Sequence, residues 1–377
     1  MARLRTDWIL FVTIVAMVGF GLVMVYSASS AVAELHYGEP YRYALMQLLY
    51  AVVAFVVLMF FKRYNYRLLN TPAWAFSGLG IVFCLLVVVY FAGSRHRWFE
   101  VMGVGLQPSE FAKPALILFL AYLISRRSQA INRGRTLLQA LVAVAMLGLT
   151  VVIADLGTAM VPVLTALIML WVAWIKRTYM TRAAMIVAVL AIVAVFSRGY
   201  RLGRVISYVD PDYSLIGMVD THGRIKSYVQ RSTSVRDASY QPRQSKIAVG
   251  AGGVFGAGLM QGKQKLMFLP EAHTDFIYAN VGEELGLWGS TLVLMGFLVI
   301  LWRGARLFAL ARDDFGKYLA LGVTVSILLQ ALFNMSVVLN LMPTKGFPLP
   351  MISYGGSSLL STLLCLGMLL SVGEHEG

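Results

Sequence analysis

Long apolar runs recur along almost the whole chain and constrain its fold more than any other feature. Each run approaches the roughly 20 apolar residues with which a helix crosses about 30 Å of hydrocarbon. Hydrophobic residues make up 59% of the 377 and charged residues 13%, whereas soluble domains carry about 25% charged residues. Soluble, disordered and disulfide-rich classes are therefore excluded. The sequence predicts an all-α integral membrane protein with ten spans, at 8–27, 43–61, 72–92, 108–124, 137–154, 159–175, 183–197, 285–302, 318–339 and 354–372.

Basic residues are distributed unevenly among the predicted loops. The formal net charge is +14, and cytoplasmic loops are the ones enriched in Lys and Arg. With the N-terminus inside, the short outer loops hold Arg42, Arg95, Arg97 and Lys345. The inner segments hold Arg3, Arg5, Lys62, Arg63, Arg67, Arg126, Arg127, Arg133, Arg135, Lys176, Arg177, Arg182, Arg303, Arg306, Arg312 and Lys317. Both termini are therefore predicted to be cytoplasmic, and the positive charge implies no nucleic-acid partner.

One long segment, 198–284, interrupts the pattern between the predicted seventh and eighth helices. Loops of more than about 60 residues are exempt from the charge rule, and structureless loops of this length are uncommon unless they have a function. The segment includes a glycine-rich stretch, 250–262. We expect a folded or re-entrant extracytoplasmic cap over the outer helix ends, within a single polytopic membrane domain, 1–377.

The glycine-rich stretch does not fit a phosphate-binding loop. That motif needs Ser or Thr after its Gly-Lys, and here Gln264 follows Gly262 and Lys263. Cys84 and Cys365 lie far apart in apolar runs and have no zinc-type spacing. No metal site is predicted, and we interpret the glycines as permitting close backbone packing or re-entry at membrane depth.

Ionisable residues at membrane depth are costly and are therefore candidate site residues. Glu110 and Lys113 are three residues apart at the start of the fourth span, so they share a helix face. They form either a structural ion pair or part of a polar cavity. Asp155 interrupts the outer end of the fifth span and has the same two interpretations. Glu283 and Glu284 are interpreted as interfacial acids near the outer surface.

Asp275 is the strongest catalytic candidate, beside His273 and directly before an apolar helix. A partly desolvated carboxylate has a raised pKa and is a better proton acceptor. The alternative is a helix cap that accepts backbone N–H groups. Lys345, in a Pro- and Gly-rich turn, either holds an anionic headgroup or faces lipid phosphates.

Five long stretches of the sequence carry a family resemblance: VMVYSASS at 23–30, RHRWFEVMGVGLQPSEFAK at 95–113, QSKIAVGAGGVFGAGLMQGKQK at 244–265, LPEAHTDFIYANVGEELGLWG at 269–289 and PTKGFPLPMISYGGSSLL at 343–360. They resemble the SEDS family (shape, elongation, division and sporulation proteins). PTKG at 343–346 is closer to the division branch, FtsW, than to the elongation branch, RodA. IADLGTA at 153–159 departs from the family's usual QPDLGTA but retains Asp155.

The resemblance implies a ten-helix glycosyltransferase of the bacterial inner membrane. It would polymerise lipid II, the lipid-linked peptidoglycan precursor, on the outer face during cell division. Its partners would be a class B penicillin-binding protein, as transpeptidase, and other divisome or elongasome proteins. By the family motif, Asp275 is the general base that deprotonates the acceptor 4-hydroxyl, and undecaprenyl pyrophosphate leaves.

This chemistry needs cations near the leaving pyrophosphate. A divalent cation, Mg²⁺ or Mn²⁺, would be compatible with it, but no ligand cluster compels one and no other cofactor is expected. The residues predicted to bind substrate or to support the site are Lys345, Glu110, Lys113, Asp155, Arg198, Arg201, Arg204, Lys246, Lys263 and His273.

Three other functions remain open. A flippase for lipid II would use Glu110, Lys113 and Asp155 to line a path. An elongation polymerase would share the chemistry but serve a different process. A non-catalytic scaffold for the penicillin-binding protein would not depend on Asp275.

Overall fold

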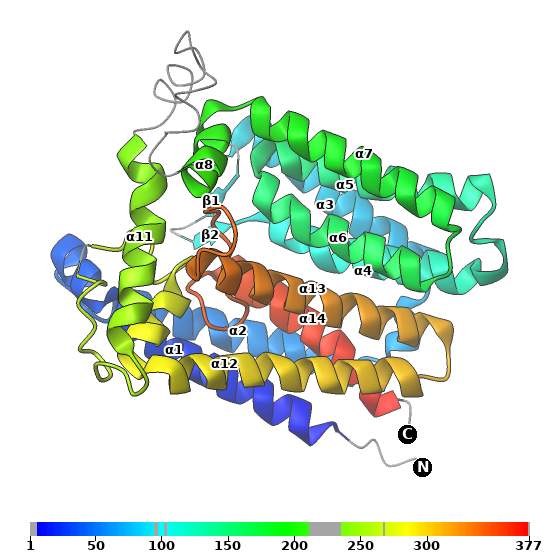
Figure 1. Ribbon diagram of the computed structural model, residues 1–377. Coiled ribbons are helices and arrows are strands. Elements are labelled where there is room, and N and C mark those ends of the chain that lie inside the picture. Colours follow the sequence, from blue (N-terminus) through cyan, green and yellow to red (C-terminus); the bar gives the residue numbers. More distant parts are fainter. Residues whose placement is uncertain (1–5, 94–96, 102–103, 211–234, 267, 376–377) are drawn as a thin grey trace, which may run out of the picture.

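The computed structural model is a bundle of long helices that run side by side between two ends of the molecule (Figure 1). It describes residues 6–93, 97–101, 104–210, 235–266 and 268–375. Among these residues, nine helices or helical segments are long and apolar enough to cross a membrane, and the apolar α6, with 17 residues, is slightly shorter. The ten helices are α1 (Trp8–Tyr37), α2 (Arg42–Arg63), α3 (Pro72–Ala92), α4 (Ala112–Arg126), α5 (Gly134–Ala154), α6 (Leu156–Val172), α7 (Arg177–Phe196), α12 (Ile277–Leu310), α13 (Asp314–Val338) and α14 (Gly356–His375).

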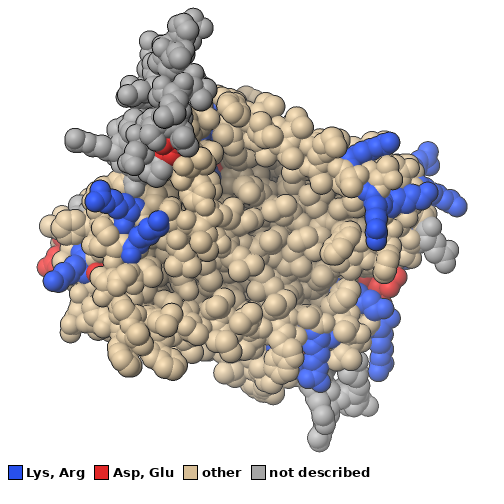
Figure 2. Space-filling view, viewed as in Figure 1, with Lys and Arg blue, Asp and Glu red and all other residues tan. Residues whose placement is uncertain are grey.

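The all-helical membrane fold is confirmed, and all ten predicted spans correspond to helices. A band almost free of charged residues separates the two ends on the face shown in Figure 2. Such a band suits contact with lipid chains, because charged groups are costly there. One short hairpin, β1 (Phe99–Val101) with β2 (Val104–Leu106), is the only strand pairing among the described residues.

Two helices extend well beyond their predicted boundaries. α1 continues to Tyr37, ten residues past the predicted end, and its polar Ser27 and Ser29 are buried inside the bundle. α12 begins at Ile277, eight residues before the predicted start, and includes Glu283 and Glu284. Hydropathy misses these turns because their polar side chains are buried and bonded.

The first and last helices meet at one end of the bundle (Figure 1). Thr6 Oγ1 donates a hydrogen bond of 2.5 Å to Glu374, which also pairs with Lys62 at 2.9 Å. At the same end, Arg303 pairs with Asp7 at 2.6 Å. This arrangement fits an even number of crossings. That this end is cytoplasmic stays a prediction, and Arg3 and Arg5 lie outside the described residues.

The opposite end carries the hairpin and two further helices, α8 (Gly199–Val209) and α11 (Val235–Gly252). Both helices belong to the predicted cap, 198–284, whose last eight residues form the start of α12 instead. Residues 211–234 of this segment, and Arg95 of the preceding outer loop, lie outside the described residues.

The glycine-rich stretch packs against a break in α12 at Gly286, whose φ is +63°. There the carbonyls of Glu283 and Glu284 accept hydrogen bonds of 2.9 and 3.0 Å from the backbone N–H groups of Ala257 and Gly258. A Cβ at Gly286 would lie 2.6 Å from the Val254 oxygen. Close backbone packing by the glycines is therefore confirmed.

Candidate active site

Asp275 lies in a turn whose backbone is fixed from three directions. Four consecutive carbonyls accept hydrogen bonds from side chains or backbone of α12, α13 and the turn before α14. The donors are Asn280 Nδ2 to Ala272 at 2.8 Å, Tyr354 N to His273 at 3.0 Å, Ser353 Oγ to Thr274 at 2.6 Å and Asn334 Nδ2 to Asp275 at 2.7 Å. The position of the Asp275 Cα is therefore set by the packing of distant segments.

The Asp275 carboxylate, by contrast, has no bonded partner among the residues that the structure describes. The cap residue of α12 is Phe276, without a side-chain cap bond, so Asp275 does not act as the helix cap. Within the part of the chain that the structure describes, no hydrogen bond or ion pair engages its carboxylate. The carboxylate lies against the backbone of Gly346, directly beside Lys345 in sequence.

The surroundings of Asp275 make it a proton acceptor near neutral pH. Burial of the carboxyl group, followed by the negative charge of Glu271, raises the pKa of Asp275 to about 6. Lys345, Arg204 and Arg97 act in the opposite direction but are outweighed. A carboxylate of this pKa is largely ionised at pH 7 and more basic than an exposed one.

Asp155 joins two cations beside this carboxylate. It is the single residue between α5 and α6 and caps α6, accepting 3.0 Å bonds from the Gly157 N–H and the Thr158 hydroxyl. Its two oxygens form ion pairs with Arg97 and Lys345. Asp155, which was predicted to interrupt the fifth span, therefore holds two cations that come from other segments of the chain.

Lys345 reaches Asp155 across a surface that only glycine provides. A Cβ on Gly157 would lie 2.6 Å from Lys345 Cγ, so the lysine stem rests on the bare backbone there. Burial, together with the charges of Arg97, Arg204 and Arg201, lowers the pKa of Lys345 to about 8, and Tyr200 opposes the shift. The ion pair with Asp155 also favours the charged ammonium.

α8 contributes further cations to this cluster. Arg204 Nη1 donates to the Thr344 carbonyl at 3.4 Å, next to Lys345. Arg201 donates to the carbonyls of Ala194 and Val152 at 3.0 and 3.3 Å. Arg201 and Arg204 therefore lie where the sequence predicted supporting cations.

Other predicted cations do not join the site. Arg198, Lys246 and Lys263 are exposed, and no contact within the described residues links them to Asp275. Their position in the long predicted loop did not reveal which of them lie close to Asp275.

The remaining candidates have structural surroundings. Glu110 and Lys113 form a buried 2.7 Å ion pair that Gln330 of α13 completes at 2.5 Å, which favours the structural interpretation. His273 packs between Tyr43 and Tyr354, with ring centroids 4.8 and 5.7 Å away. Burial lowers the pKa of His273, so its ring is neutral at pH 7.

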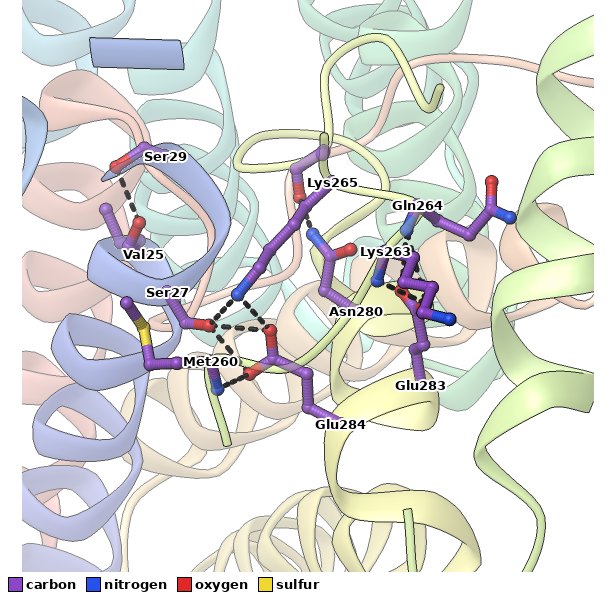
Figure 3. A network of polar contacts seen from close by, with 11 residues as sticks. Val25, Ser27, Ser29, Met260, Lys263, Gln264, Lys265, Asn280, Glu283 and Glu284 are labelled. Atoms are coloured by element: carbon purple, nitrogen blue, oxygen red, sulfur yellow. Dashed lines mark hydrogen bonds and ion pairs between the residues drawn. The ribbon is translucent and has the colours of Figure 1, made fainter. Parts of the chain in front are cut away.

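Glu283 and Glu284 are not interfacial, so that expectation was wrong. Both are buried, and Figure 3 shows them bonded to the segment that precedes the Asp275 turn. Glu283 accepts from the Lys263 backbone N–H at 2.7 Å, and Glu284 pairs with Lys265 at 2.7 Å. Ser27 of α1 donates to Glu284 at 2.6 Å.

Sequence reasoning missed Arg97, Lys265 and Asn334 as contributors. Arg97 was counted only as a loop charge, although it lies inside one of the stretches that carry the family resemblance. Lys265 was one of eleven basic residues in a long segment, and Asn334 is one polar residue in an apolar helix. Only the tertiary contacts distinguish them.

Among the described residues, no group of three or more His, Cys, Asp or Glu side chains is arranged to hold a metal ion. Asp155 is already engaged by two cations. These side chains therefore do not fit a resident metal.

Comparison with known proteins identifies the family. The model of the FtsW/RodA/SpoVE family of cell cycle proteins matches residues 7–377. The chain belongs to this family. It is the family that the sequence resembles, and membership makes the chain a multi-pass protein of the bacterial inner membrane.

Curated relatives match over nearly their full length. The chain is 37% identical over 97% of its length, and 92% of the relative's, to the probable peptidoglycan glycosyltransferase FtsW of Trichlorobacter lovleyi. It is 34% identical to the stage V sporulation protein E of Bacillus subtilis, covering 98% of this chain and 97% of that one.

Solved structures share the fold. A chain from a peptidoglycan synthase complex that coordinates polymerization and crosslinking matches with a TM-score of 0.75 and 22% identity, over 99% of both chains. The rod shape determining protein RodA of Thermus thermophilus matches with a TM-score of 0.63 and 23% identity, over 98% of this chain and 97% of that one.

Proposed function

We propose that this chain, a peptidoglycan glycosyltransferase by its family and relatives, polymerises lipid II on the outer face of the inner membrane during cell division. Asp275 is the general base. The observation that carries the proposal is a backbone-anchored carboxylate of raised pKa, unpaired among the described residues, beside a cluster of cations.

The reaction transfers the donor glycan from its undecaprenyl pyrophosphate carrier to the 4-hydroxyl of the acceptor. Asp275 accepts the proton of the acceptor 4-hydroxyl, whose oxygen attacks the anomeric carbon of the donor. A new glycosidic bond forms while the bond to undecaprenyl pyrophosphate breaks, with inversion at that carbon. A base of pKa near the working pH suits this step.

The cations stabilise the leaving group. Negative charge develops on the pyrophosphate as the bond breaks, and fixed cations lower the energy of that state. Lys345, Arg97 and Arg204 lie near Asp275 and supply this charge. Asp155 holds Lys345 and Arg97 in place until the phosphate oxygens approach.

No step of this mechanism passes through a metal held by the chain. If a Mg²⁺ or Mn²⁺ ion takes part, the oxygens of the substrate pyrophosphate would hold it, and it would supply positive charge at the leaving group. Polymerisation measured with and without a chelator tests this expectation.

A class B penicillin-binding protein is the proposed partner, with other division proteins around it. The similar chain of known structure from a synthase complex supports this pairing.

The alternative functions fit the structure less well. A flippase would need a polar path, yet Glu110 and Lys113 form an ion pair with each other and are buried between helices. A scaffold alone would give no reason for a carboxylate of raised pKa that has no partner among the described residues.

The decisive experiment uses the complex with the penicillin-binding protein and purified lipid II. Asp275→Asn should bind the partner and make no glycan strands, since the amide cannot accept the proton. Glu39→Gln, an exposed acid in the turn between α1 and α2, should polymerise like the wild type. Full polymerisation by Asp275→Asn would overturn the proposal.

A further inference from the structure

A basic cavity lies between the end of α4 and the start of α5, far from Asp275 in the sequence. Its volume is about 530 Å³, within the usual range of about 300–1,000 Å³ for ligand pockets. The lining residues are Arg126, Arg127, Ser128, Ala130, Arg133, Arg135 and Thr136. Four of these seven are arginines, so the cavity attracts an anion.

The arginines of the cavity differ in ion pairing from other basic residues that are predicted to be cytoplasmic. Several of those have acidic partners among the described residues: Lys62 with Glu374, Arg67 with Asp313, Arg303 with Asp7 and Lys317 with Asp314. Between Glu110 and Asp155 the sequence contains no Asp or Glu. The arginines of the cavity have no ion pair within the described residues and bond only to neutral groups, such as Asn70 O and Thr136 Oγ1.

The start of α5 adds a further preference for negative charge. The cap residue of α5 is Arg133, which makes no side-chain cap bond. The first N–H groups of a helix lack partners within it and form its positive end. The arginines and the helix start therefore point to the same ligand charge.

An apolar surface continues from the cavity along α5. Leu138, one turn beyond Arg135, is 61% exposed, and Val142 is 54% exposed. Because α5 is long and apolar enough to cross a membrane, we expect these exposed side chains to face lipid chains near the headgroups. A ligand with both a phosphate and an acyl chain would contact both surfaces, whereas free phosphate would contact only the arginines.

We propose that this cavity binds the phosphate headgroup of an anionic phospholipid, with its acyl chains along α5. Basic pockets at the ends of membrane helices suit such headgroups, since each nearby Lys or Arg adds to the attraction. Guanidinium groups also match phosphate oxygens in geometry. The site is independent of the glycosyltransferase reaction.

The test measures lipid retention by the full chain, delipidated in neutral detergent. Phosphatidylglycerol or phosphatidylcholine is added, and bound lipid is read by native mass spectrometry. The wild type should retain phosphatidylglycerol about tenfold better than phosphatidylcholine. Arg133→Gln/Arg135→Gln should lose about tenfold in phosphatidylglycerol binding.

A matched variant controls for net charge. Arg177→Gln/Arg182→Gln removes two exposed arginines from a neighbouring helix, outside the cavity, and should retain the lipid. Equal losses in both double variants would mean that any positive surface suffices, and would overturn the proposal.

Two further outcomes are decisive. Inorganic phosphate at millimolar concentration should leave the bound lipid in place; if it displaces the lipid from the cavity, the ligand is a soluble phosphate and the lipid assignment fails. Asp275→Asn should bind phosphatidylglycerol like the wild type, so this result is separate from that of the polymerisation assay.

Discussion

The residues around Asp275 set the pH at which it accepts a proton. Because the pKa of Asp275 is about 6, glycan formation should fall as the pH drops through about 6 and the base becomes protonated. Glu271 raises this pKa through its negative charge. Glu271→Gln should therefore lower the pKa of Asp275 and shift the acid limb of the pH–rate profile to lower pH.

The control for this shift is Glu39→Gln, which removes an equal charge from an exposed position and should leave the acid limb unchanged. An acid limb that stays in place, or moves to higher pH, in Glu271→Gln would show that Asp275 does not govern the profile.

Gly157 should be as necessary as the charged residues that it supports. A Cβ added at Gly157 would lie 2.6 Å from Lys345 Cγ, so Gly157→Ala should push the lysine side chain away from Asp155. We expect polymerisation to fall about tenfold or more, by analogy with other misplaced electrostatic groups. Gly80→Ala in α3, with open space around its Cβ, should have wild-type activity; equal activity of the two variants would contradict the role of Gly157.

Single residues were predictable where the sequence marked them individually. Asp275 precedes an apolar helix, Lys345 lies in a short turn and Asp155 interrupts a span, so each stood out. Arg204 and Lys263 looked alike in the sequence, yet one reaches the site and the other is exposed. The difference depends on how α8 and the glycine-rich turn fold back, which spacing alone does not encode.

At the scale of elements, the start of α12 depends on buried charge. Lys265 and Glu284 have side chains that are 4% and 0% exposed, and Ser27 ties them to α1 (Figure 3). This network joins the segment before the Asp275 turn to α12 and α1. The sequence predicted α12 as a span but began it at 285, because hydropathy scores a buried paired carboxylate as if it faced water.

Breaking this pair should unfold the protein more easily. Lys265→Met leaves the Glu284 charge buried without its cation, which typically costs about 3–5 kcal/mol. The midpoint of thermal unfolding in detergent should therefore fall markedly. Lys265→Met/Glu284→Gln should recover much of the loss, because the uncompensated charge is gone.

The comparison for this pair is an exposed one. Lys317→Met at the 3.9 Å contact with Asp314 should change the free energy of unfolding by at most about 1 kcal/mol. Equal losses at the two sites would show that burial of the Lys265–Glu284 pair is not what matters.

For the whole molecule, the basic residues fall into two groups at opposite ends of the bundle. Figure 2 shows Lys and Arg side chains gathered at the two ends of the molecule. The cations around Asp275 belong to one end, and the ion-paired Lys62 and Arg303 belong to the other. The count of spans was predictable because each one is a long local run. The convergence of Arg97, Asp155 and Lys345 was not, since it joins segments about 60 and 190 residues apart.

The two ends should face opposite sides of the membrane. The N-terminal end of α1 and the C-terminal end of α14 lie together, near Glu374, and that end carries the predicted cytoplasmic excess of Lys and Arg.

A green fluorescent reporter fused to either terminus should fluoresce, because it folds in the cytoplasm. Alkaline phosphatase, which folds only outside, should be active when inserted at 215–225, in the predicted outer segment, and inactive in the turn at 311–313. Phosphatase activity at 311–313, or a dark reporter at one terminus, would contradict the even number of crossings or the outward position of Asp275.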